Sequence, residues 1–130
     1  MKLIKFRGKD NHGKWYFGGI TSDKKFITAQ FTFQSVCPET VGQFTGFYDI
    51  NHTELYEGDV IEINKVPYVI KWFDSRGCFL LENDSVRRAM RNTEICTIMG
   101  NVHDNPKLFR ILQTEFLKQR EKEERELEKC

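Results

Sequence analysis

The chain has 130 residues, of which 39% are hydrophobic, 13% aromatic and 30% charged, and its net charge is +1. A chain of this length forms one domain or two very small ones, and it can bury roughly 65 to 70% of the surface that its unfolded state exposes. The near-zero net charge argues against a dedicated binder of polyanions. The four widely spaced cysteines predict reduced thiols instead of a disulfide framework or a zinc site.

The sequence predicts a protein that stays in the cytoplasm of the cell that makes it. Residues 1–7 alternate charged and apolar side chains, whereas a signal peptide has a continuous apolar region. No run approaches the ~20 apolar residues that a membrane-spanning helix needs. We therefore expect no membrane partner.

Charge is distributed unevenly along the first half of the chain. Residues 1–30 contain seven Lys or Arg and two Asp, a balance of +5, whereas residues 31–64 contain six acids and no base, a balance of −6. This segregation predicts that the N-terminal strands pack against the acidic centre or help subunits to dock. A dedicated basic binding face is the less favoured interpretation.

The N-terminal third predicts β-strands joined by turns. Residues 3–7 and 14–17 form a hairpin around the turn at residues 10–13, and a second β segment covers residues 26–34, with Phe31 and Phe33 on one face. Pro38 lacks an N–H group and restricts the residue before it. It therefore predicts a loop or a strand boundary, and a sub-boundary of the domain, at residues 35–40.

The middle of the chain predicts a bent sheet. Strands are expected at residues 41–47, 60–63, 68–73 and 78–82, with turns at 49–53, 65–67 and 74–77, so residues 60–82 form a three-stranded meander. Residues 83–92 are polar and predict a helical turn, because Val86, Ala89 and Met90 follow an i, i+3, i+4 spacing. Residues 94–102 predict the last strand.

The C-terminal segment predicts a helix that begins at Asp104-Asn105-Pro106, an Asx cap followed by proline. Its apolar stripe ends at Leu117, and residues 118–130 form a charged tail supported by i, i+4 ion pairs. The helix either packs on its own sheets or meets the same helix of a neighbouring subunit. The residues expected to mediate self-association are Leu108, Phe109, Leu112 and Phe116.

These elements predict a mainly β (α+β) fold of small, strongly bent, barrel-like sheets with a C-terminal α-helix. The expected domain is residues 1–105, followed by the helix and charged tail of residues 106–130.

Three ordered blocks resemble the YopX family of phage and prophage proteins. They are Ile4-Lys5-Phe6-Arg7, then Gln43-Phe44-Thr45-Gly46 with Glu54-Leu55-Tyr56-Glu57-Gly58-Asp59-Val60-Ile61, and finally Met99-Gly100-Asn101-Val102-His103-Asp104-Asn105-Pro106-Lys107-Leu108. The resemblance implies a mainly β fold with a C-terminal helix, a mobile-element origin and self-assembly, and it brings no catalytic residues. It also implies that the expected cytoplasm is that of a bacterial host cell. His52 stands where the family often has glycine, so a two-residue type I′ turn is not expected there.

An acidic cluster of Glu54, Glu57 and Asp59 is the best candidate for an active site, because paired carboxylates can share a proton or hold a divalent cation. The favoured interpretation is structural: Gly58 takes a positive φ and Asp59 caps the turn through local backbone bonds. The three histidines are expected at surface turns. We therefore predict a protein that is not an enzyme and has no cofactor or metal.

Two binding functions stay open. The leading hypothesis is a self-associating protein that binds a macromolecule, such as a phage or host protein. The alternative is a nucleic-acid binder, in which basic groups follow the phosphates and aromatic rings stack on unpaired bases. Its candidate contacts are Lys5, Arg7, Lys14 and Trp15, with a second basic group at residues 87–91.

Overall fold

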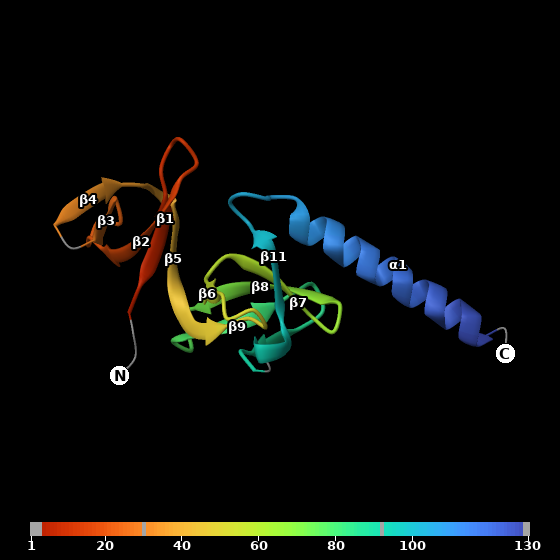
Figure 1. Ribbon diagram of the computed structural model, residues 1–130. Coiled ribbons are helices and arrows are strands. Elements are labelled where there is room, and N and C mark those ends of the chain that lie inside the picture. The colour runs from red at the N-terminus through yellow and green to blue at the C-terminus, as the bar shows by residue number, and fades with distance from the viewer. Residues whose placement is uncertain (1–3, 30, 92, 129–130) are drawn as a thin grey trace.

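The computed structural model describes residues 4–29, 31–91 and 93–128, which form two antiparallel sheets and one helix (Figure 1). The first sheet has the strand order β4-β3-β2-β1-β5-β6, and the second has the order β10-β9-β8-β7-β11. The predicted fold class, mainly β with a C-terminal helix, is confirmed. Both sheets are strongly bent, but within the described residues neither closes into a barrel.

The first sheet contains six strands that follow one another along the chain. They are β1 (Phe6–Lys9), β2 (Trp15–Ile20), β3 (Phe26–Ala29), β4 (Thr32–Ser35), β5 (Cys37–Tyr48) and β6 (Glu54–Tyr56). The segment at residues 26–34, predicted as continuous, is instead a hairpin in which Ala29 pairs with Thr32. Its turn contains no glycine or proline, so alternation of side chains alone did not locate it.

The strand boundary predicted within residues 35–40 is present, because β4 ends at Ser35 and β5 begins at Cys37. A loop at Pro38 is wrong, because β5 continues through that residue. Pairing between β1 and β5 shifts register between Arg7 and Lys9, and the Lys9 N–H donates to Thr40 Oγ1 at 2.9 Å. An irregularity of this kind accommodates a proline within a strand. The long β5 therefore runs through the expected sub-boundary and connects the N-terminal strands to the second sheet (Figure 1).

The second sheet confirms the predicted meander of residues 60–82. Its strands are β7 (Asp59–Ile63), β8 (Val66–Phe73), β9 (Cys78–Glu82), β10 (Arg87–Ala89) and β11 (Thr97–Asn101), with a 3₁₀ helix at Thr93–Ile95. The turn predicted at residues 65–67 lies slightly earlier, at Asn64 and Lys65, whose φ angles are 52° and 68°. Two consecutive positive φ angles are typical of a type I′ hairpin, so Pro67 already belongs to β8.

The helical turn predicted within residues 83–92 is wrong. Residues 87–89 form β10, in which Arg88 pairs with Leu81 and Ala89 with Leu80. An i, i+3, i+4 spacing over so few residues does not distinguish a helical turn from a short strand. Backbone pairing with β9 decides the structure here, and Met90 enters the core at 8% exposure.

The main hydrophobic core is formed by the second sheet together with Leu55 of β6. Its buried members are Leu55, Ile61, Ile63, Tyr68, Ile70, Leu81, Met90 and Cys96. Each large apolar side chain removed from water contributes roughly 1.5 to 3 kcal/mol. This core fixes the second sheet as the platform on which the helix and the N-terminal strands are placed.

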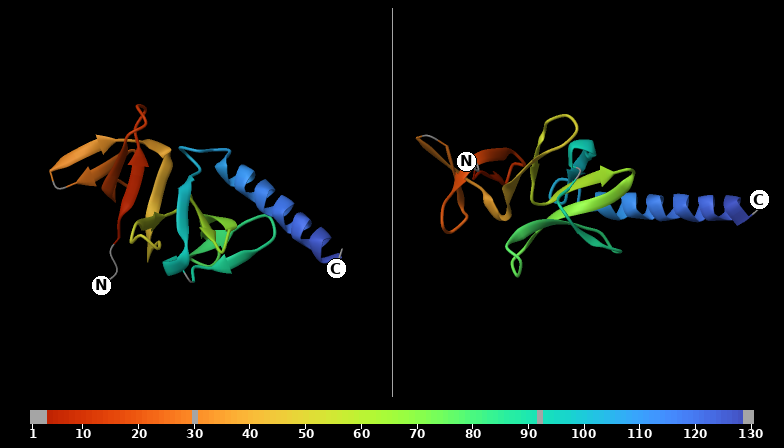
Figure 2. Two further views of the ribbon diagram at one scale, coloured as in Figure 1. Left: turned by 45° about the vertical axis from the view of Figure 1, so that its right-hand side comes forward. Right: turned by 90° about the horizontal axis from the view of Figure 1, so that it is seen from below.

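The helix α1 (Leu108–Glu128) packs on β8 with its first half only. The two views in Figure 2 show that its second half leaves the body of the protein. Gln113 is buried and accepts the Asp84 N–H at 3.1 Å, whereas from Leu117 to Glu128 the side chains are exposed. Among the described residues, no helix is long and apolar enough to span a membrane.

Candidate functional site

Three ion pairs join the beginning of the chain to later elements, at the junction between the two sheets. The ammonium of Lys5 lies 2.6 Å from Glu54, the guanidinium of Arg7 lies 2.7 Å from Asp59, and the ammonium of Lys9 lies 2.6 Å from Asp104. Alternate residues of a strand share one face, so the three cations point the same way. The first two pairs confirm that the basic N-terminal segment packs against the acidic centre.

Arg7 is the most enclosed of the three cations, with 9% of its side chain exposed. Its guanidinium lies 4.7 Å from the ring centroid of Trp15 and 4.9 Å from that of Tyr56. One nitrogen, Nη2, donates to Asp59 and, at 3.4 Å, to the carbonyl of Glu57. Since a buried cation needs both charge compensation and hydrogen bonds, this enclosure serves the fold.

Asp59 performs the structural role expected of it. Its Oδ2 accepts the Tyr56 N–H at 2.8 Å, and the preceding Gly58 has a φ of +92°. Burial raises the pKa of Asp59, whereas the charge of Arg7 and the Tyr56 N–H act to lower it. The Glu57-Gly58-Asp59 segment is thus a turn held by its own carboxylate.

Glu54 has separate partners. One carboxylate oxygen binds Lys5, and the other accepts the Tyr56 hydroxyl at 3.0 Å. Burial and the hydrogen bond to Glu54 raise the pKa of Tyr56. The structure therefore does not bring the three carboxylates of the acidic cluster to one centre, and the described part of the chain holds no group of three His, Cys, Asp or Glu side chains suited to a metal.

Asp104 forms the third polar centre of the junction. It accepts hydrogen bonds from Lys9, from Trp15 Nε1 at 2.9 Å and from Asn101 Nδ2 at 2.9 Å. Partial burial acts to raise the pKa of Asp104, but the bonds from Lys9, Trp15 and Asn101 outweigh it and lower that pKa to about 2. The Trp15 indole therefore contacts Arg7 through its ring and Asp104 through its N–H group.

Of the four candidate nucleic-acid contacts, Lys5, Arg7 and Trp15 make these internal contacts. Lys14 is exposed, and its ammonium lies 5.3 Å from the ring centroid of Tyr16. Contact with nucleic acid through these four residues stays a prediction.

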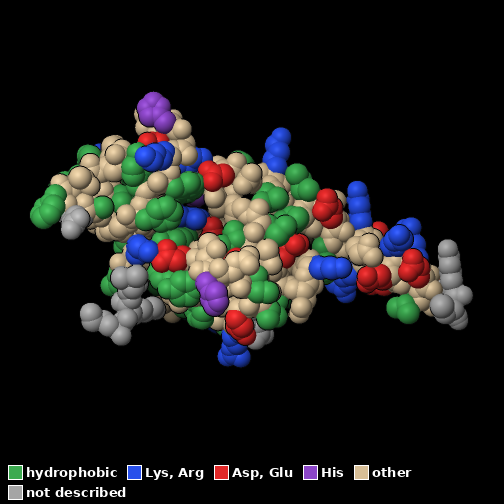
Figure 3. All heavy atoms as spheres, in the orientation of Figure 1, with side chains coloured by type: hydrophobic (Ala, Val, Ile, Leu, Met, Phe, Trp, Pro, Cys, Tyr) green, Lys and Arg blue, Asp and Glu red, His purple; other side chains and the backbone are tan. Residues whose placement is uncertain are grey.

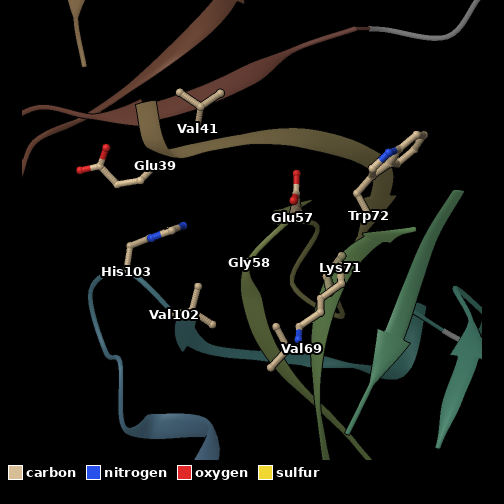
Figure 4. A pocket seen from close by; sticks show the side chains of 10 residues that line it. Glu39, Val41, Glu57, Gly58, Val69, Lys71, Trp72, Val102 and His103 are labelled. Atoms are coloured by element: carbon tan, nitrogen blue, oxygen red, sulfur yellow. The ribbon is translucent and has the colours of Figure 1, made fainter. Parts of the chain in front are cut away.

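A pocket of about 300 Å³ lies beside this junction (Figure 4). Glu39 and Val41 of β5 line one side, Glu57 projects from the β6–β7 turn, and Val69 of β8 and His103 line the opposite side. His103 is half-buried, contrary to the expected surface position, and burial and the nearby charge of Arg7 lower its pKa. No local motif signals this pocket, because its walls come from distant segments.

The family-like blocks form the bends that shape the junction. Thr45 Oγ1 donates to the Leu55 carbonyl at 2.8 Å beside Gly46, whose φ is +87°. Asn101 Oδ1 accepts the N–H groups of His103 and Asp104 at 3.0 and 2.8 Å. These short polar and glycine residues make turns that other side chains form less readily.

A family model described as "YopX protein" matches residues 2–110. The chain belongs to the YopX family. Most of α1 lies beyond the matched residues of this YopX chain. No curated protein matches it. Among solved structures it is similar to protein EF1440 from Enterococcus faecalis, with a TM-score of 0.54, 19% identity, and coverage of 84% of this chain and 99% of that one. At this identity the likeness shows the fold alone.

Proposed function

We propose that this YopX-family protein acts by binding macromolecules, that it self-associates through α1, and that it catalyses no reaction. The projecting half of α1 carries this proposal. Leu117 is 45% exposed and Leu127 is 75% exposed, and Figure 3 shows charged side chains of both signs along the projecting helix. The mobile-element origin implied by the family resemblance makes a phage or host protein the expected partner.

A helix that projects into water is marginally stable alone, and packing of an apolar stripe against another helix stabilises it. At 3.6 residues per turn, positions 117, 120, 124 and 127 share one side of α1. Antiparallel pairing with a second copy around Lys122 places Leu117 against Leu127 and Arg120 against Glu124. Parallel pairing would instead oppose like charges at positions 120 and 124, so charge complementarity favours the antiparallel dimer.

In this arrangement, the side chains that the sequence predicted to mediate self-association pack α1 against the body of the protein. Leu108, Phe109, Leu112 and Phe116 are half-buried in the part of α1 that lies against the body. They fix the direction in which the helix leaves the protein. The contact between copies is therefore assigned to the exposed stripe that follows them.

Charge reversal tests the antiparallel pair. We expect Arg120→Glu and Glu124→Arg each to weaken association about tenfold, because each opposes like charges across the interface, and the double variant to restore it. Light scattering after gel filtration over a range of concentrations measures the association. A wild-type monomer at all concentrations, or a double variant no better than the single ones, would contradict the proposal.

Nucleic-acid binding is the second candidate, and the β3–β4 hairpin supports it. Phe31 is 93% exposed and Phe33 is 70% exposed, close in sequence to the exposed Lys24 and Lys25. Exposed rings beside basic groups suit unpaired bases and their phosphates. Figure 3 shows hydrophobic side chains at this end of the molecule.

Fluorescence anisotropy with a labelled single-stranded oligonucleotide tests this candidate. We expect affinity that falls with added salt and drops about tenfold in Phe33→Ala, since stacking contributes roughly 1 to 3 kcal/mol per base. Ile50→Ala removes an exposed apolar side chain elsewhere and serves as the control. Absence of binding at low salt would exclude this function.

A further inference from the structure

The walls of the pocket between the sheets are largely apolar. Val41 of β5, Val69 of β8 and Val102 after β11 line it, and Figure 4 shows their side chains around one space. Its volume of about 300 Å³ lies at the lower end of the range for small-ligand pockets. The space suits a short unbranched hydrocarbon chain.

The charged groups around this space leave it acidic. Glu39 and Glu57 both line it, whereas the Lys71 ammonium, on the same wall, lies 3.0 Å from Glu82. Burial and the charge of Arg7 lower the pKa of His103, which favours its neutral ring. The pocket therefore presents two carboxylates and no uncompensated cation on its own described walls.

Glu57 is the more enclosed of the two carboxylates. Burial raises its pKa, and the charge of the exposed Lys24 lowers it by less, while Asp74 acts in the same direction as burial. A half-buried carboxylate of this kind is stabilised when a cation enters beside it. The charge of an occupant that fits the pocket is thus positive.

We propose that this pocket binds an alkylammonium group. The methylene chain lies among Val41, Val69 and Val102, and the ammonium donates hydrogen bonds to Glu57 and Glu39. This arrangement buries apolar surface and forms charge-assisted hydrogen bonds at the polar end. A lysine side chain of another protein and a free diamine share this chemistry.

Titration of the full chain with butylammonium tests the proposal, with amide chemical shifts of residues 58, 69 and 102 as the readout. We expect saturable shifts there, and about tenfold weaker binding in Glu57→Gln and in Glu39→Gln. Glu62→Gln changes a half-buried glutamate of β7 outside the pocket and should leave the affinity unchanged. Titration with butanol at the same ionic strength separates the contribution of the ammonium charge to binding from that of the hydrocarbon chain.

Two further probes distinguish the sources of the alkylammonium group. N-acetyl-lysine amide represents a partner's lysine, and cadaverine represents a free diamine. The probe that binds with the higher affinity identifies the source. Binding of butanol as tight as that of butylammonium, equal affinities of the wild type and both variants, or the absence of shifts at these amides would overturn the proposal. The exposed position of Glu39 means that Glu39→Gln tests the charge even where Glu57→Gln alters the fold.

Discussion

At the residue scale, the enclosure of Arg7 links two parts of the chain that lie 52 positions apart. Its guanidinium is stacked between two rings and bonded to the buried Asp59. Breaking such a pair leaves an uncompensated charge inside the protein, which costs more than the intact pair contributes. The stability of the junction between the sheets therefore depends on both partners being present.

Replacing Asp59 by Asn should destabilise the protein by about 3 to 5 kcal/mol, because Arg7 stays buried without a carboxylate. Urea unfolding followed by circular dichroism measures this loss. Glu54→Gln removes the half-exposed pair with Lys5 and should cost about 1 kcal/mol or less. Equal losses in the two variants would show that Arg7 does not need its partner.

Asp104 should make part of the unfolding free energy depend on pH. Its pKa in the folded protein is about 2, below the ordinary value of 3.8. The ionised carboxylate therefore stabilises the fold fully above about pH 4, and this contribution is lost as the pH falls toward about 2.

Comparison of the wild type with Asp104→Asn measures the contribution of this carboxylate. Because Asp104 is partly exposed, we expect a difference in unfolding free energy of up to about 1 kcal/mol at pH 6, which disappears near pH 2. Chemical denaturation across this pH range provides the measurement. A difference that grows on acidification would contradict the expected sign.

At the element scale, the β5–β6 turn places a residue other than glycine at a positive φ. His52 has a φ of +60°, and its N–H donates to the Asp49 carbonyl at 3.0 Å. Asp49 is buried and its Oδ1 accepts the N–H groups of Asn51 and Thr53. The turn therefore spans more than two residues, as the sequence predicts, and the Asp49 side chain holds His52 in a left-handed conformation.

The substitution His52→Gly should stabilise the protein by about 0.5 to 1 kcal/mol. Relief of the left-handed strain contributes roughly 1 to 2 kcal/mol, and the greater freedom of glycine in the unfolded chain offsets part of it. Thermal unfolding measures the effect, and Asn51→Gly, at a position without positive φ, should destabilise. A loss of stability in His52→Gly would mean that its side chain contributes more than the strain costs.

At the scale of the whole molecule, α1 divides into a docked half and a projecting half. Gln113 anchors the first half to Asp84, whereas the side chains from Leu117 to Glu128 are exposed. Association between copies would cover the projecting half, and a monomer would leave it open to proteases. Proteolysis thus reports on the assembly of the entire protein.

Trypsin should first cleave the basic sites of the projecting helix, at Lys118, Arg120, Lys122 and Arg125. We expect cleavage to slow as the protein concentration rises, because the dimer covers these sites, and mass spectrometry of the early fragments identifies them. The Arg76 site in the β8–β9 turn is exposed and serves as an internal reference. Slowing at both regions alike would mean that association does not protect α1.

The sequence by itself determined the elements whose chemistry is local. The Glu57-Gly58-Asp59 turn, the meander and the helix after Asn105 follow from residues next to one another, and ordered blocks identified the family. Two residues for which the sequence gives an expectation lie outside the described residues: Cys130, expected as a reduced thiol, and Leu3, expected in the first strand. The missed hairpin at residues 26–35 has no glycine or proline at its turn, and the spacing of apolar residues around β10 also suits a helical turn, so only pairing with neighbouring strands defined these strands.

Only the tertiary structure decided which side chains meet. The pairing of Arg7 with Asp59, and the meeting of Glu39, Val69 and His103 around one pocket, depend on strand register and on the bend of β5. Such contacts join residues far apart in the chain, and no local propensity specifies them. The sequence predicted attraction between a basic start and an acidic centre, and the folded sheets determined that it fixes the junction between them and leaves an acidic pocket beside it.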